Sequence, residues 1–425
     1  LRIRDLPIAY FPWLRFPLND DRQSGFLMPS GGHDSTNGTE IIVPYYFNLA
    51  PQYDATYQLN SLWKRGLVHD GQLRFLAGQS TNTINLGYIN ADDLYGGETV
   101  KDQTTGESFT LPPAEKQDRW YINARHHGNW SNRITSTINF SAVSDGQYLQ
   151  DIGGDFGSRS LDRFANSVDQ SLTSRRAPAL ERRGELKYRG DAWNTTLSVL
   201  GFQNLEPDQP KEYELLPRLT SDLSRRYGPA TLRVGLELTS FDKNTELLAG
   251  PNAIVGERGV VDVTATLRRA ALWGYIEPAI GVIHRNYDLD NTPANARRHA
   301  EITTPRLSLD TGLIFDRFFS VADTQMQQTL EPRLFFLYVE EDSQDDLPRF
   351  DVTPLTPGFD QLFRTNRFSG YDRIGDTQQL SLAVTSRLLR RNTGDELLSA
   401  SLGQIYYFKD REVIYRPRPS DDPQA

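Results

Sequence analysis

The adjacent pair His126-His127 is the first place where this chain of 425 residues could hold a metal ion. Neighbouring side chains on an extended strand point to opposite faces, so these two rings cannot bind one ion together. The other histidines are scattered along the chain, and neither an H-E-x-x-H motif nor a cysteine is present. The sequence therefore predicts no metal centre and no cofactor.

Motifs for covalent catalysis are absent as well. Serine, histidine and aspartate all occur, but no G-x-S-x-G turn presents a serine nucleophile. The glycine-rich stretch at 151–159, DIGGDFGSR, lacks the lysine and the strand–helix context of a phosphate-binding loop. We therefore expect a protein that is not an enzyme.

An acidic stretch, EEDSQDDLPRFD, covers residues 340–351. Two interpretations of it stay open. One is a solvated extracellular loop, and the other is a weak Ca²⁺ site that uses carboxylate oxygens as ligands.

Two prolines, Pro29 and Pro44, stand in the two apolar arms of a predicted hairpin, GFLMPSGGHDSTNGTEIIVPYYFNLAP at 25–51. Proline has no amide donor, so it belongs at a strand edge, a strand start or a bulge. A turn centred between Thr36 and Asn37 would place the two prolines opposite each other. An Asn-Gly tip would instead place Pro44 opposite Gly31.

The elements that must position these residues are strands, because period-2 alternation dominates the chain. In ATLRVGLELTSF, for example, Leu232, Val234, Leu236 and Leu238 share one face, and Arg233 and Glu237 lie on the other. Arg387 occupies a polar position in a second alternating run, QLSLAVTSRL. Charged residues are costly against lipid, so we expect Arg233, Glu237 and Arg387 to face a wet lumen.

Three features favour an outer-membrane barrel over a soluble β-sandwich. Many of the strands run to about ten residues, the length that crosses a bilayer at a tilt. Tight turns, predicted at 69–72 (HDGQ) and 189–193 (RGDAW), alternate with long polar loops such as 340–370. Aromatic residues cluster near strand ends, as in Tyr45-Tyr46-Phe47.

Composition agrees with this fold class. The mean hydropathy is −0.54, which a barrel tolerates because only one face of each strand is apolar. The net charge of −9 argues against a nucleic-acid-binding surface. The chain opens with Leu-Arg-Ile-Arg and no leader pattern, so we expect an internal fragment.

Several stretches resemble the LptD family of lipopolysaccharide-assembly outer-membrane proteins, also called organic solvent tolerance proteins. They occur in the family's order, from the first residues to about residue 410: PWLRFPLNDDRQSGFLMPS, VPYYFNLAPQYDAT, RGLVHDGQLRFL, LEPRLFFLYV, YDRIGDTQQLSLAVTSRL and SLGQIYYF. The resemblance implies a barrel of about 26 strands, preceded by a periplasmic jelly-roll domain. It also implies that the family's cysteines lie outside this fragment.

The predicted fold is therefore all-β: an antiparallel transmembrane β-barrel that is partial, with roughly 14–16 strands of a larger barrel in a strongly curved sheet. We expect a linker from the periplasmic domain at 1–23, barrel strands at 24–410 and a polar loop at 411–425.

The resemblance implies a function and partners. Lipopolysaccharide would pass through the polar lumen and leave through a lateral seam at the first strand, in the cell outer membrane of a Gram-negative bacterium. Pro29 and Pro44 match the positions linked to opening that seam, although bending the strands or blunting an edge is the plainer explanation. The implied partners are lipopolysaccharide, the lipid bilayer, an LptE-like lipoprotein plug and periplasmic bridge proteins. A general porin and a soluble β-rich binding protein remain the alternatives.

Overall fold

A computed structural model gives the fold. It describes residues 22–96, 117–153, 179–205, 212–243, 253–293, 297–321 and 324–415, together with four short strands, Arg2–Ile3 (β1), Leu6–Pro7 (β2), Glu98–Lys101 (β9) and Ser108–Leu111 (β10). Most of the linker predicted at 1–23 and the end of the segment 411–425 lie outside the described residues.

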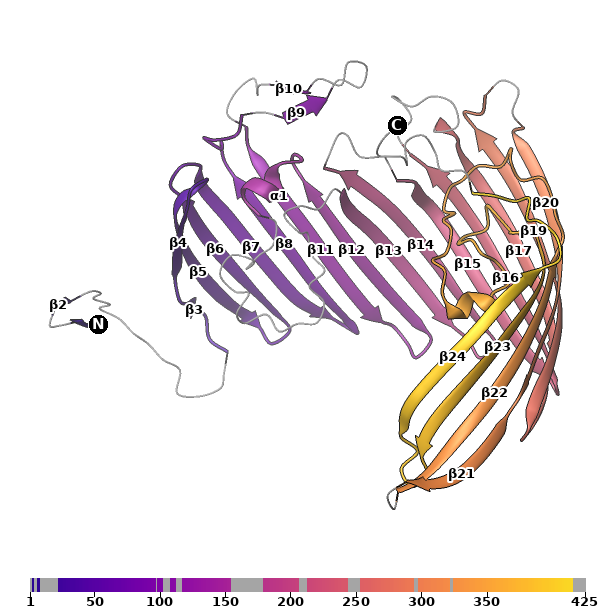
Figure 1. Ribbon diagram of the computed structural model, residues 1–425. Coiled ribbons are helices and arrows are strands. Elements are labelled where there is room, and N and C mark those ends of the chain that lie inside the picture. Colours follow the sequence, from indigo (N-terminus) through magenta and orange to yellow (C-terminus); the bar gives the residue numbers. More distant parts are fainter. Residues whose placement is uncertain are drawn as a thin grey trace. The chain divides into compact units, whose positions relative to one another are not determined.

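The chain divides into two compact units, and the first contains the N-terminal strands. They form an antiparallel run in which β3 and β4 both pair with β5, and β5, β6, β7, β8 and β11 follow in order (Figure 1). The bounds are Gly25–Phe26 (β3), Ser30–Asp34 (β4), Gly38–Ala50 (β5), Tyr53–Leu62 (β6), Gly66–Ala77 (β7), Ser80–Ile89 (β8), Arg119–Asn129 (β11) and Ile134–Val143 (β12), of which Thr137 onward belongs to this unit. One short helix, Tyr148–Asp151 (α1), follows β12.

The second unit contains the remaining strands, again paired antiparallel in chain order. Their bounds are Ala179–Arg189 (β13, mostly in this unit), Trp193–Asn204 (β14, mostly in this unit), Glu214–Tyr227 (β15), Ala230–Asp242 (β16), Val255–Leu267 (β17), Arg269–Ala271 (β18), Gly274–Asp290 (β19), His299–Leu313 (β20), Phe315–Val321 (β21), Thr324–Val339 (β22), Thr377–Arg390 (β23) and Glu396–Tyr407 (β24). A 3₁₀ helix, Phe359–Phe363 (η2), lies in the long β22–β23 loop, residues 340–376.

The all-β, antiparallel prediction is confirmed. Three strands are each interrupted once and so appear as two segments that pair with the same neighbour. These segments are β3 and β4 on β5, β17 and β18 on β19, and β20 and β21 on β22. Counting each such pair once, and leaving out the hairpins β1–β2 and β9–β10, the described residues hold seventeen sheet strands, slightly more than the roughly 14–16 expected. Among the described residues no helix has the length and apolarity that crossing a membrane requires.

The two faces of the strands differ in polarity, as the alternation of the sequence predicts. On β16, Leu236 and Leu238 are 47% and 60% exposed, whereas Glu237 and Thr239 on the opposite face are each only 3% exposed. Large apolar side chains such as Ile280 and Leu402 are likewise exposed. An apolar outer face with buried polar residues behind it is the arrangement that suits strands in contact with lipid.

One of the two predicted tight turns differs from the structure. The HDGQ sequence at 69–72 lies inside β7, because both neighbouring strands pair continuously across it, and Gly71 pairs with Tyr57 and Leu86. The chain reverses instead at 63–65 and at 78–79, where Gly78 supplies a positive φ of 59°. The turn predicted at 189–193 is confirmed, since β13 ends at Arg189 and β14 begins at Trp193.

A charge placed on the apolar face should cost more than the same charge placed on the polar face. We expect Leu236→Arg to lower the free energy of unfolding in a bilayer by about 2–4 kcal/mol, because the guanidinium would meet hydrocarbon. Denaturant titration in lipid vesicles measures this. The matched control is Thr196→Arg on the polar face of β14, and an equal loss in the two variants would contradict this assignment of faces.

Candidate functional site

The first strand of the chain's sheet is attached to β5 by an interrupted ladder. Phe26 of β3 pairs with Tyr45 of β5, and Ser30 of β4 pairs with Ile42 of β5. Residues 27–29 therefore lie opposite only two residues, 43 and 44. This extra residue is a β-bulge, and it contains one of the two prolines. Seven residue pairs join β5 to this strand, whereas ten join β5 to β6.

Pro44 lies at the same break. Its carbonyl oxygen accepts a hydrogen bond from the Leu27 amide at 3.0 Å. The nitrogen and oxygen of one strand residue point to the same neighbour, so the donor that Pro44 lacks is also missing on the side of β3 and β4. Prolines occur inside β19, β20 and β22 as well, at 278, 305 and 332. A single proline at a bulge also occurs in β15, at Pro217. Among the ladders whose register is described, this one is therefore distinguished by a proline on each side of the bulge.

The tip of this hairpin differs from both predicted registers. Asp34 pairs with Gly38, which leaves a three-residue loop at 35–37, and Gly38 has a φ of 82°. This is a turn that ends in a left-handed glycine, a common three-residue hairpin loop. The register places Pro29 opposite Val43 if it continues from β4, so the prolines are offset by one residue and lie at nearly the same height.

The hairpin tip is anchored in a buried ionic cluster that we call the Arg119 cluster: Arg65, Asp92, Arg119, Asp145 and Asp151. The Asn37 side chain accepts a hydrogen bond from Arg65 Nε at 2.6 Å and donates one to the carbonyl of Asp151 at 3.1 Å. The turn between β4 and β5 is thereby connected to α1.

Arg119 lies at the centre of this cluster and is fully buried. Its guanidinium bonds Asp145 with two nitrogens, at 2.8 and 2.9 Å, and bonds Asp92 at 2.7 Å and Asp151 at 2.9 Å. Arg65 bonds Asp92 at 2.8 Å from the other side. A buried charge is tolerated only with such partners, so loss of one of them leaves an expensive unpaired ion.

The pKa of Asp145 depends on two opposing influences, burial of the carboxyl and its interaction with Arg119. Burial alone raises the pKa of this carboxyl, but the hydrogen bonds and charge of Arg119 outweigh burial and hold the pKa below its ordinary value. Asp145 is therefore ionised at neutral pH.

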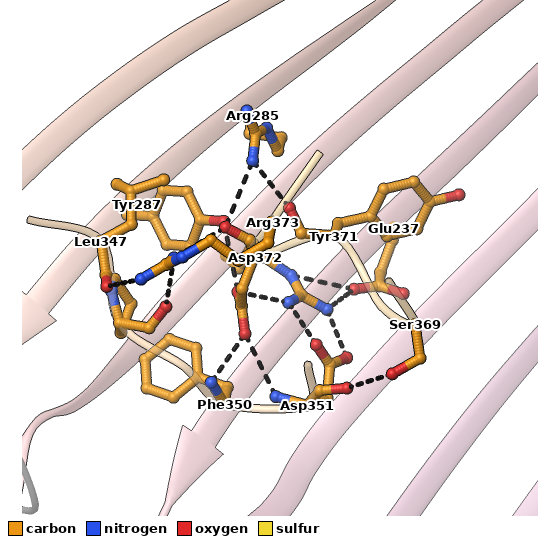
Figure 2. A network of polar contacts seen from close by, with 12 residues as sticks. Glu237, Arg285, Tyr287, Leu347, Phe350, Asp351, Ser369, Tyr371, Asp372 and Arg373 are labelled. Carbon is orange, nitrogen blue, oxygen red and sulfur yellow. Dashed lines mark hydrogen bonds and ion pairs between the residues drawn. The ribbon is translucent and has the colours of Figure 1, made fainter. Parts of the chain in front are cut away.

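A second cluster on the polar face of the other unit is centred on Arg258, which is 1% exposed (Figure 2). Its guanidinium bonds both oxygens of Asp351 at 2.7 Å and one oxygen of Asp372 at 2.6 Å. It also bonds Glu237 on β16. We call Glu237, Arg258, Asp351 and Asp372 the Arg258 cluster.

Asp372 and Asp351 connect two parts of the β22–β23 loop to each other, and they connect the loop to the strands β17 and β19. Asp372 accepts the amide protons of Phe350, at 2.6 Å, and Asp351, at 3.1 Å, and the Tyr287 hydroxyl donates to its other oxygen at 3.2 Å. Burial opposes ionisation of Asp351, but the hydrogen bond and charge of Arg258 prevail and lower the pKa of this carboxyl.

Further arginines fix the same loop. Arg285 of β19 donates to the carbonyl of Tyr371 at 2.9 Å and to Gln344 at 3.1 Å. Arg373 donates to the carbonyls of Leu347 at 2.9 Å and Pro348 at 3.1 Å, which closes the loop on itself (Figure 2).

The expectation that 340–351 is a solvated loop holds for residues 340–346, which are exposed except for Gln344, and is wrong for residues 347–351. Leu347 and Phe350 are buried, and the Phe350 ring stacks on Phe241 of β16 with 4.2 Å between centroids. Of the acidic residues in this run, Asp351 compensates the buried Arg258. The other five, Glu340, Glu341, Asp342, Asp345 and Asp346, are exposed. In the described part of the chain no group of three or more His, Asp or Glu side chains is arranged to hold a metal, which leaves the Ca²⁺ interpretation without support.

The three polar residues singled out in the sequence lie in different surroundings. Glu237 belongs to the Arg258 cluster and also bonds Arg218 at 2.6 Å. Arg233 lines a cavity and has no ion pair among the described residues. Arg387 pairs with Glu396 at 2.9 Å and Glu331 at 3.3 Å, and it is half-buried. The structure thus does not bring the three together.

Sequence reasoning missed the two arginines that organise the loops, Arg119 and Arg258. Alternation gives the face on which an arginine lies but not its partners, which come from distant loops. The motif YDR at 371–373 was the available signal, since it is polar, short and lies in a segment that resembles the family.

Removing the Arg258 charge should release the β22–β23 loop. We expect Arg258→Met to leave three carboxylates without their main partner and to destabilise the docked loop by about 3–5 kcal/mol. Hydrogen exchange at the amides of Phe350 and Asp351 measures the release. Arg226→Met on β15, which removes an exposed arginine without an ion pair in the described residues, is the control. Unchanged protection in the Arg258 variant would show that the cluster does not hold the loop.

The Arg119 cluster should weaken only in acid. The folded-state pKa of Asp145 is lowered, so its stabilising contribution is complete above the unfolded value of about 3.8 and is lost as the pH falls through the folded value. The Lys64 amide donates to the carbonyl of Asn37 at 3.1 Å and so reports on the anchored hairpin tip. Exchange protection at this amide, corrected for intrinsic rates, should be constant from pH 7 to pH 5 and fall below about 3.8.

An Asp145→Asn variant should already show reduced protection at neutral pH, because the amide cannot compensate Arg119. Asp118→Asn, at an exposed carboxylate, is the control. Protection that declines near pH 6 in the unmodified protein would be inconsistent with this role for Asp145.

Comparison with known proteins agrees with the geometry. The family model described as "LptD: LPS transport system D" matches residues 117–425. The LPS-assembly protein LptD of Hahella chejuensis is 35% identical over 419 residues, which is 97% of this chain and 49% of the relative. That of Pseudomonas aeruginosa strain UCBPP-PA14 is 34% identical over 443 residues, covering 97% of this chain and 45% of the relative. The chain thus spans about half the length of the curated relatives it matches.

Solved structures align only distantly. OmpT, an outer membrane protein of Vibrio cholerae, aligns over 91% of this chain and 96% of its own at 7% identity, with a TM-score of 0.27. OccK11 of Pseudomonas aeruginosa covers 91% of this chain and 90% of its own at 10% identity, with a TM-score of 0.29. Neither likeness is close enough to support a conclusion. The family model and the curated relatives are sufficient, and the chain belongs to the LptD family.

Proposed function

We propose that this chain is part of the wall of an outer-membrane protein that delivers lipopolysaccharide to the outer leaflet. Family membership carries the proposal, since the relatives that align with 97% of the chain are named LPS-assembly proteins. The family is a transport family, so the function is movement of a lipid and not a chemical reaction.

The two-faced strands supply a route for such a cargo. Lipopolysaccharide combines a large sugar–phosphate head with several acyl chains. The head suits a polar face rich in arginine and carboxylate, whereas the chains require hydrocarbon. Both requirements are met together only if the wall opens sideways.

Opening should cost less at the interrupted first ladder than at a continuous one. Separating paired strands in hydrocarbon leaves each backbone donor and acceptor unsatisfied, at several kcal/mol per group. The bulge at 27–29 and the missing donor of Pro44 reduce the number of bonds that must break. We infer that Pro29 and Pro44 mark the lateral seam.

The partners follow from the same proposal. A wide polar lumen needs a plug to prevent leakage, which is the role we assign to an LptE-like lipoprotein. Periplasmic bridge proteins would supply the lipid from below. The outer membrane of a Gram-negative bacterium is the location that fits both.

Restoring the missing donors should slow delivery. We expect Pro29→Val combined with Pro44→Val to strengthen the ladder and to reduce lipopolysaccharide at the cell surface severalfold, at unchanged protein level. Surface labelling of lipopolysaccharide measures this. The matched control is Pro278→Val combined with Pro332→Val, which changes two strand prolines of the second unit. Normal delivery in the first double variant would refute the seam.

A general porin is the alternative function, and liposome swelling separates the two. The full-length protein with its plug should pass small sugars poorly, whereas a porin passes them freely. Rapid swelling with the complete complex would favour the porin.

A further inference from the structure

A cavity of about 600 Å³ lies between the polar face of β15–β20 and the β22–β23 loop. The strands provide most of its lining, and Phe363, Thr365 and Tyr371 of the loop close it on the other side. A volume of this size is within the range of sites that hold small organic ligands.

Several polar side chains around this cavity have no hydrogen-bond or ion-pair partner within the described residues. Asp222 and Arg233 are the charged ones, and they come from the neighbouring strands β15 and β16. The others carry hydroxyl groups: Ser224, Thr266, Ser308, Thr365 and Tyr371. These groups come from four strands and one loop, and together they offer both donors and acceptors.

The remaining charged residues of the lining are already paired. Asp262 bonds Arg306, Asp310 bonds Arg333 at 2.9 Å, and Glu277 bonds Arg268 at 2.8 Å. One unpaired carboxylate and one unpaired guanidinium remain, so the unpaired groups carry no net charge. The cavity therefore presents a balanced set of polar groups and not an anion site.

This balance selects the class of ligand. A phosphate would gain Arg233 but would face the carboxylates of Asp222, Asp262 and Asp310. A neutral sugar presents several hydroxyls, each of which donates and accepts, and so it can bond carboxylate, guanidinium and hydroxyl partners at once. The Phe363 ring is covered by Arg333, 3.7 Å from its centroid, so polar contacts and not ring stacking would provide recognition.

We propose that this cavity is a binding subsite for a neutral sugar unit of the glycolipid that the protein transports. The inference rests on the proposed function for the source of the sugar. It adds a place on the wall, between β15–β20 and the loop held by the Arg258 cluster, at which the saccharide pauses.

Binding of a lipid-free, dephosphorylated core oligosaccharide to the full-length protein, purified with its plug in detergent, tests the proposal. Isothermal titration calorimetry should detect saturable binding. The combined change Asp222→Asn and Arg233→Gln should weaken that binding at least tenfold, because it removes the two charged partners. Arg226→Gln, on β15 but outside the cavity, should change the affinity less than twofold.

Tyr371→Phe provides a milder variant that removes one hydroxyl and leaves the charges in place, and it should weaken binding two- to fivefold. Absent binding of the oligosaccharide to the unmodified protein, or equal affinity in the Asp222/Arg233 variant, would overturn the proposal. So would binding of inorganic phosphate at the same cavity in preference to the oligosaccharide.

The two proposals fail separately. Loss of oligosaccharide binding is read on purified protein and does not require the seam, whereas the proline variants are read as delivery in cells. Oligosaccharide binding that survives in the proline variants while delivery also continues would refute the seam alone.

Discussion

The buried arginine surrounded by carboxylates is the interaction on which both units depend. Arg119 and Arg258 each project from the polar face of a strand, and each is compensated by acids that come from loops. Burying such charges is costly, so the loops have to fold back onto the wall to supply their partners. This arrangement determines what covers the polar face. In the second unit the docked β22–β23 loop covers it, and in the first unit the tip of the first hairpin is bound there.

How far the sequence predicts this structure depends on the range of the interactions. Alternation is local, and it assigned the faces of β16 correctly, with Leu236 outward and Glu237 buried. Turn chemistry was less reliable, because the Asp-Gly pair at 70–71 lies within a continuous strand while Gly78 makes the turn. Neither alternation nor turn chemistry predicts which residues pair with a buried charge. Neither interpretation of the acidic run at 340–351 therefore includes the bond from its Asp351 to an arginine 93 residues earlier in the chain.

The first hairpin has an interrupted ladder between its two strands and a tip that is anchored by side-chain hydrogen bonds. Its ladder to β5 is broken by the bulge and by Pro44, but Asn37 at its tip is bonded to Arg65 and to α1. The residues that anchor this strand are thus different from those that interrupt its pairing.

The separation along the chain of the groups that meet in these clusters has a consequence for assembly. Asn37 and the Asp151 carbonyl are 114 residues apart, and so are Arg258 and Asp372. Contacts of such long range form late, after the intervening loop-closure entropy has been overcome. During biogenesis the guanidinium groups of β11 and β17 must therefore remain hydrated until the later segments arrive. A nascent sheet of this kind needs an aqueous side until its loops have docked.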